Sequence, residues 1–112
     1  RAINRLGMEG QMEGGVAMGV GFALKEKFVP GETKSFKQYR LPRSTEVPET
    51  CVYSVEIPQG PGPFGAIGMG EAAHFPMAPA IVAAINEACG IWIDDLPADP
   101  EKILAAIKKQ SA

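Results

Sequence analysis

The sequence has few of the residues that build metal, redox or nucleic-acid sites. Its 112 residues include two cysteines, one histidine, one tryptophan and two tyrosines. Cys51 and Cys89 form no CxxC pair, and His74 has no cysteine or acidic partner at metal-ligand spacing. We therefore predict no metal held by protein side chains alone, two reduced thiols and a cytoplasmic location, because disulfides are rare in the cytosol.

Neither charge nor hydrophobicity is concentrated in one stretch. Eleven basic and thirteen acidic residues give a net charge of -2 with no basic block, so nucleic acid is not an expected partner. The longest segment without Asp, Glu, Lys or Arg, residues 72–86, contains two prolines and is shorter than the roughly 20 residues that span a bilayer. We predict no membrane span. The first residue is Arg1 rather than Met, and we expect the natural chain to extend before it.

The hydrophobic pattern predicts three helices. Apolar residues recur at helical spacing in residues 11–28 and 79–89, with Gly90 as the expected C-terminal stop of the second helix. A third helix is predicted to begin at Pro100, with Asp99 as its N-cap.

Alternating patterns predict short strands at residues 35–40, 51–57 and 91–93. In residues 51–57, Tyr53, Val55 and Ile57 lie on the face expected to be in the core. The predicted fold class is therefore α+β, with about three helices packed on a few strands. We expect residues 1–112 to form a single domain or subdomain.

Four glycines lie inside the first predicted helix: Gly14, Gly15, Gly19 and Gly21. Each costs about 1 kcal/mol relative to alanine in a helix interior, so a compensating gain in packing is expected. We expect another helix, a strand or a ligand to approach this backbone closely. A tight contact between helix and sheet explains the glycines as well as a ligand does.

A shaped loop is predicted between the second strand and the second helix, because residues 58–70 contain five glycines and three prolines. Its Gly60 to Gly65 portion matches GxGxxG, but Pro61 and Pro63 have no N–H to offer a pyrophosphate. We therefore do not expect a Rossmann-type dinucleotide-binding site at this loop.

Glu71 ends this loop and is the candidate catalytic residue. A carboxylate held by a glycine-rich loop suits a positioned general base. The alternative is a carboxylate that interacts with the dipole at a helix N-terminus. We expect a packing or hydrogen-bonding role for His74, and a solvated turn before a helix for Asp94 and Asp95.

Several segments resemble, in the same order, segments of the large, molybdenum-binding subunits of the xanthine dehydrogenase/aldehyde oxidoreductase family. They cover nearly the whole chain: Gly10-Gln-Met-Glu-Gly-Gly15, Tyr39-Arg-Leu-Pro42, Glu46-Val-Pro-Glu49, Gly62-Pro-Phe-Gly-Ala-Ile-Gly-Met-Gly-Glu71, Ala78-Pro-Ala-Ile-Val-Ala-Ala-Ile85, and Asp95-Leu-Pro97 with Pro100-Glu-Lys102.

The resemblance implies that the chain is a C-terminal part of a molybdopterin-binding domain. It implies hydroxylation of an aldehyde or an N-heterocycle with water as the oxygen source, with Glu71 as the catalytic base. It also implies cofactor contacts from these residues: Gln11, Ile67, Gly68, Met69 and Gly70. A base in this role needs a pKa raised toward neutrality, which burial or an anionic neighbour provides.

The cofactor implied is molybdopterin with molybdenum, either as the plain pterin or as its cytosine dinucleotide. The partners implied are the remainder of the molybdenum subunit, an iron–sulfur domain or subunit that removes electrons, and, as a further candidate, a flavin domain or subunit. Taken alone, this segment is expected to be inactive. Ile67 stands where the family often has lysine, and Ala72-Ala73 replaces a commoner Pro-Pro pair, so the substrate stays open. A non-catalytic binding or assembly module that kept the family core is the alternative function.

Overall fold

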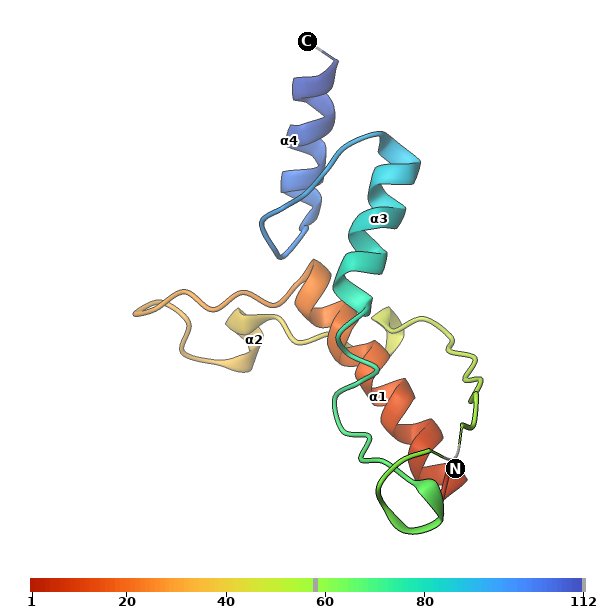
Figure 1. The fold of residues 1–112 in the computed structure, drawn as a ribbon. Coiled ribbons are helices and arrows are strands. Elements are labelled where there is room, and N and C mark those ends of the chain that lie inside the picture. Colours follow the sequence, from red (N-terminus) through yellow and green to blue (C-terminus); the bar gives the residue numbers. More distant parts are fainter. Residues whose placement is uncertain (58, 112) are drawn as a thin grey trace.

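The computed structural model describes residues 1–57 and 59–111 and is built from helices joined by long connections (Figure 1). Its four α-helices are α1 (Arg5–Leu24), α2 (Phe36–Tyr39), α3 (Met77–Cys89) and α4 (Pro100–Gln110). Two short 3-10 helices, Ser44–Glu46 and Pro63–Gly65, lie in the connections. Within these ranges there is no β-strand, so the α+β prediction is wrong.

The segment 35–40, predicted to be a strand, contains the short helix α2 instead. The Ser35 hydroxyl accepts a hydrogen bond from the backbone N–H of Gln38, and Arg40 ends the helix in the left-handed conformation with φ of 70°. Serine favours such a cap, and this local signal outweighs the alternation of side chains.

The other two predicted strands, residues 51–57 and 91–93, have no regular secondary structure. A strand needs hydrogen bonds to a neighbouring strand, and in the described part of the chain neither segment has one. Tyr53 and Val55, on the predicted core face, are 83% and 88% exposed. In residues 91–93 the alternation does mark burial, because Ile91 and Ile93 are buried while Trp92 is exposed.

Helix α1 begins earlier and ends earlier than the predicted range 11–28. The Asn4 side chain accepts a hydrogen bond from the backbone N–H of Gly7 at 3.0 Å and caps the helix there. The first turns contain glycines and isolated polar residues, so the apolar pattern used to predict the helix is not seen there. The helix ends at Leu24, so Lys25 and Lys27, which lie inside the predicted range, are outside it.

Helices α1 and α3 pack against each other where the glycines of α1 lie (Figure 1). A Cβ atom added to Gly15 would lie 2.7 Å from Cβ of Ala73, and one added to Gly19 would overlap Met77 at the start of α3. The close approach predicted from the glycines is therefore confirmed, and its partner is a helix with its preceding turn rather than a sheet. Gly14 faces open space within this chain.

A second cluster joins α3, α4 and the end of α1. Its buried members are Ile91, Ile93 and Ala98, and the backbone N–H of Ala98 donates to the Ala23 carbonyl at 2.7 Å. The predicted C-terminal stop of α3 and the predicted N-cap of α4 are confirmed here. The Asp99 carboxylate accepts from the backbone N–H of Lys102 at 2.9 Å, and Gly90 closes α3 with a φ of 69°.

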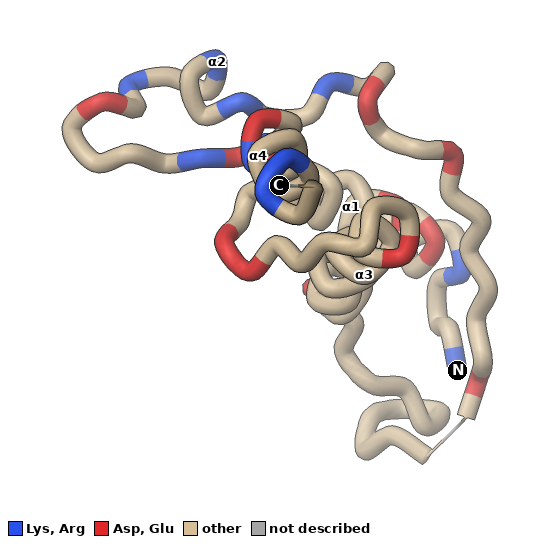
Figure 2. Tube along the Cα trace, turned by 90° about the horizontal axis from the view of Figure 1, so that it is seen from above, with Lys and Arg blue, Asp and Glu red and all other residues tan. Residues whose placement is uncertain are grey.

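The chain is much more open than a compact domain of its length. Its radius of gyration is 17.3 Å, whereas about 13 Å is typical for this length. It exposes 8360 Å² of surface, and a compact monomer of this mass exposes about 5,900 Å². Figure 2 shows the α1–α2 connection projecting away from the helices, and a long tan stretch at residues 59–70, which contain no charged side chain. No described helix is long and apolar enough to cross a bilayer.

Candidate functional site

The loop before Glu71 is folded back on itself by its own backbone. The N–H of Gly60 donates to the Gly65 carbonyl and the N–H of Gly62 to the Ala66 carbonyl, both at 3.0 Å. A Cβ atom on Gly60 or Gly62 would lie within 2.6 Å of the Ala66 carbonyl oxygen. These glycines are thus required by close backbone contact within the loop, which is the shaped structure that the composition predicted.

The backbone N–H groups of the next residues, Ile67 to Glu71, point to no acceptor in the described part of the chain. In the part of the chain that the structure describes, none of their N–H groups donates a hydrogen bond. Cβ atoms added to Gly68 or Gly70 would meet no heavy atom within 4 Å. The segment is therefore a row of free donors with open space beside both glycines, which suits a polar or anionic ligand that approaches the backbone closely.

Gln11 joins this loop to α1. Its side-chain Nε2 donates a hydrogen bond to the Gly70 carbonyl oxygen at 2.5 Å, across 59 positions of sequence. Two of the residues that the resemblance placed at the cofactor are thus in direct contact. Sequence reasoning placed them at one site and did not predict that they bind each other.

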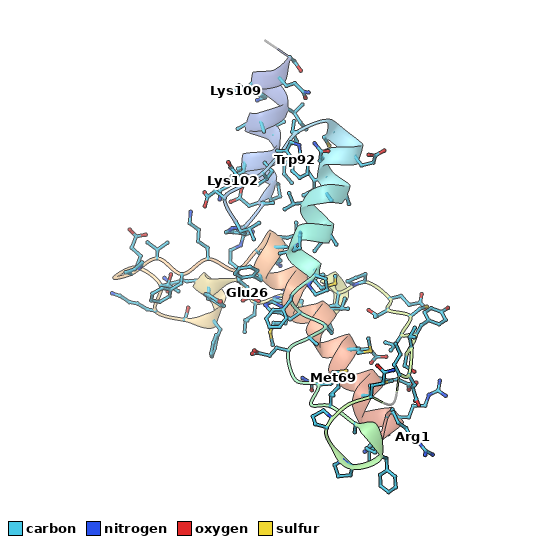
Figure 3. The ribbon with its side chains drawn as sticks, in the orientation of Figure 1. Arg1, Glu26, Met69, Trp92, Lys102 and Lys109 are labelled. Atoms are coloured by element: carbon cyan, nitrogen blue, oxygen red, sulfur yellow. The ribbon has the colours of Figure 1, made fainter. Side chains whose placement is uncertain are left out.

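A cleft of about 430 Å³ lies between the loop, the start of the chain and residues 54–57. Ile67, Gly68 and Met69 line it, and Figure 3 shows Met69 beside the N-terminal half of α1. Gln11, Gly70 and Glu71 do not line this cleft. Sequence reasoning missed its lining residues 1–4 and Met8, which carry no motif and meet the loop only through the tertiary fold.

Glu71 is exposed and lies well before the first residue of α3. Its carbonyl accepts from the backbone N–H of His74 at 3.0 Å, which opens a series of turns, and the helix begins only at Met77. The field of a helix dipole falls off within the first turn. The explanation of Glu71 as a carboxylate at a helix N-terminus is therefore wrong.

His74 packs against an aromatic side chain of α1. Its ring lies edge-on to Phe22, with the ring centroids 5.8 Å apart. Its Nδ1 atom is buried and has no hydrogen-bond partner among the described residues. The predicted packing role is confirmed.

The pair Asp94 and Asp95 lies in an exposed turn before α4. The Asp95 carboxylate is 2.8 Å from Nζ of Lys102, and hydrogen bonding from that ammonium holds the pKa of Asp95 below its usual value. Lys102 lies in α4, so the turn is tied to the start of that helix. This fits the solvated turn that the sequence predicted. Cys51 and Cys89 are both free and exposed.

Comparison with known proteins gives matches over nearly the whole chain. Residues 1–48 match the model of a molybdopterin cofactor-binding domain. The chain is 34% identical to a probable xanthine dehydrogenase subunit of Bacillus subtilis, with 96% of this chain and 15% of that protein aligned. It is 38% identical to the aldehyde oxidoreductase of Megalodesulfovibrio gigas, with 94% of this chain and 12% of that protein aligned.

A solved structure has the same fold over this region. The crystal structure of quinoline 2-oxidoreductase from Pseudomonas putida 86 matches 96% of this chain and 15% of that chain, with a TM-score of 0.87 and 31% identity. The chain thus spans about 12–15% of the length of these three relatives. The chain belongs to the xanthine dehydrogenase/aldehyde oxidoreductase family of molybdenum-dependent oxidoreductases, and it corresponds to a segment of the large subunit.

Proposed function

We propose that this chain supplies the catalytic base and a cofactor-contacting loop to the active site of a molybdenum hydroxylase. The observation that carries the proposal is the position of Glu71. It directly follows residues 67–70, whose N–H groups have no acceptor in the described part of the chain. Gln11 holds the residue before it, and it lies outside the helix that would otherwise explain it. In this proposal residues 1–112 form a subdomain of the molybdopterin-binding domain.

The residues present fit a pterin cofactor. Molybdopterin carries polar ring atoms and a phosphate. The N–H groups of Ile67, Gly68, Met69 and Gly70, which have no acceptor among the described residues, are donors of the kind that such a group requires. The open space beside Gly68 and Gly70 allows close approach to that backbone. Molybdopterin with its molybdenum, when bound, supplies the two-electron redox chemistry of hydroxylation with water.

The role of the protein chain is to hold a proton acceptor in place. Glu71 accepts the proton from the attacking oxygen at a carboxylate oxygen, so that oxygen adds to the electrophilic carbon of an aldehyde or N-heterocycle. In the net reaction a C–H bond of that carbon is replaced by the C–O bond, and the two electrons released would go to the oxidant that the cofactor supplies. The glycine-rich segment before Glu71 has few side chains that could cover it, so its carboxylate is accessible to the reacting group. Glu71 is exposed within this chain. The remainder of the subunit then has to exclude water from it.

The wider assembly follows from the same proposal. The remainder of the molybdenum subunit covers the open surface, and an iron–sulfur domain or subunit removes the electrons, with a flavin domain or subunit as a further candidate. The pterin carries either no added nucleotide or a cytosine dinucleotide. A further relative, from Paenarthrobacter nicotinovorans and 38% identical to this chain, is named as subunit gamma of a dehydrogenase complex, which supports an assembly of several subunits. A cytoplasmic location stays a prediction.

The test replaces Glu71 by Gln in the whole molybdenum subunit. The amide keeps the size and hydrogen bonding of the side chain but cannot accept the proton. We expect molybdenum content to stay unchanged and the rate of metal reduction by substrate in a single turnover to fall by about 10²–10⁴-fold. Metal content and rate are measured on the same sample, because an empty site would also lower the steady-state rate.

The matched control is Glu87→Gln, which changes an exposed carboxylate on α3 away from the loop. It should leave the rate and the metal content within about twofold of the parent values. This change is much smaller than the fall in rate expected when a general base is lost. A fully loaded Glu71→Gln subunit that reacts within about tenfold of the parent rate would contradict the assignment. The chain would then act as the non-catalytic binding or assembly module.

A further inference from the structure

The contact between Gln11 and Gly70 lies at the peptide unit that leads into Glu71. The Gly70 carbonyl carbon is bonded to the backbone nitrogen of Glu71, and the atoms of this peptide unit lie close to one plane. A hydrogen bond that fixes the Gly70 oxygen therefore also fixes the direction in which the chain enters Glu71. Gln11 reaches this oxygen at 2.5 Å from α1.

Little else within this chain restrains the backbone at that point. Apart from the bond from Gln11, no hydrogen bond to a backbone N–H or C=O group of residues 67–70 is present among the described residues. Gly68 and Gly70 have open space where a side chain would pack. Glycine also gives the backbone more conformations than any other residue. Without this hydrogen bond, the entry to Glu71 would sample a wide range of directions.

Gln11 is itself held on a rigid element. It lies in the first half of the 20-residue helix α1, whose packing on Ala73 and Met77 ties the helix to the segment on the far side of Glu71. The loop is thus fixed on one side of Glu71 by the Gln11 amide and on the other by the glycine contacts of α1. Sites supported from helices are held more precisely than sites on free loops.

We propose that Gln11 is a positioning residue for Glu71, acting through the Gly70 carbonyl. This inference depends on the proposed function, in which Glu71 is the base. It differs from a direct cofactor contact, because the Gln11 amide donates to the protein backbone and its effect reaches the reaction only through the placement of Glu71.

The main variant is Gln11→Met in the whole subunit, since methionine keeps the length of the side chain and has no N–H donor. Misplacement of a catalytic group by about 1 Å can cost about 10²-fold in rate. We expect a fall of about 10- to 100-fold in the single-turnover rate per bound molybdenum, with KM within about twofold. In the cofactor-loaded subunit, where the proposed function has the cofactor accept from these N–H groups, amide hydrogen exchange in residues 67–70 should increase by about 2- to 12-fold, the factor expected for loss of one hydrogen bond.

The matched control is Gln110→Met. Gln110 makes the same kind of contact, with its Nε2 donating to the Gly90 carbonyl oxygen at 3.1 Å, but at the far end of the chain from Glu71. Its loss should increase exchange near residue 90 and leave the rate per molybdenum within about twofold, because the two contacts share no residue.

A double-mutant cycle separates positioning from a general structural role. If Gln11 acts only through Glu71, then Gln11→Met in a Glu71→Gln background should change the rate by less than about twofold. Equal effects of Gln11→Met in both backgrounds would overturn the inference. So would a loss of activity that simply follows a loss of molybdenum, which would indicate a direct cofactor contact. Near-parent activity of Glu71→Gln alone would instead refute the proposed function.

Discussion

The packing of α1 on α3 depends on Gly19, and replacing it by alanine tests that packing with a single methyl group. The added Cβ would overlap the Cβ of Met77 and lie 2.7 Å from its Cγ. The Cβ of Met77 is fixed to the backbone of α3, so it can move only if the helix moves. The change therefore cannot be absorbed by a side-chain rotation.

Two opposing effects set the change in the free energy of unfolding caused by Gly19→Ala. Overpacking a well-packed contact costs about 1–3 kcal/mol, whereas alanine in place of glycine gains about 1 kcal/mol of helix propensity. Because the overlap is with a backbone-fixed atom, we expect the cost near the upper end of that range and a net destabilisation of about 1–2 kcal/mol. Gly19→Leu should destabilise further, since the larger side chain has to enter the same space.

The assay is unfolding of the whole subunit by urea, with molybdenum content measured before each experiment. Gly14→Ala is the control, because a Cβ atom there meets nothing within 4 Å in this chain. It should gain up to about 1 kcal/mol from propensity alone. A Gly19→Ala subunit as stable as the parent, or more stable, would show that α1 and α3 are not packed closely at this point.

Two further predictions concern the start of α4. Asp99→Ala should destabilise by about 1 kcal/mol, because it removes the carboxylate that caps the backbone N–H of Lys102, and a urea titration measures this. Asp95 has its pKa lowered by Lys102, so its contribution is present above its unfolded pKa of about 3.9 and is lost as pH falls through the lower folded value. Lys102→Met should therefore reduce the amount of stability that is lost as the pH falls below about 4. An unchanged pH dependence of the free energy of unfolding would refute the pairing.

The C-terminal end of α3 and the N-terminal end of α4 were predicted most accurately, because a few local residues determine them. Gly90 and Asp99 were assigned as a C-terminal stop and an N-cap from the sequence, and both have those roles. The order of the family motifs likewise identified the family without any knowledge of the fold. Both kinds of information lie in short stretches of sequence and do not require contacts between distant segments.

The strand predictions failed because a strand depends on a neighbour. Residues 51–57 alternate as a strand would, but in the described part of this chain no other segment forms strand hydrogen bonds with them. Alternation records which side chains are apolar, and it cannot show whether the backbone has a partner. In residues 35–40 a serine cap decided the conformation instead.

For the candidate site, the sequence by itself determined which residue types are present: a glycine-rich loop, a carboxylate at its end and a glutamine near the start of the chain. Only the tertiary structure decided that Gln11 holds the Gly70 carbonyl and that Glu71 lies outside a helix N-terminus. The physical reason is that these relations depend on α1 packing against the turn and helix after the loop. That packing joins positions some 60 residues apart, and no local pattern of residues encodes it.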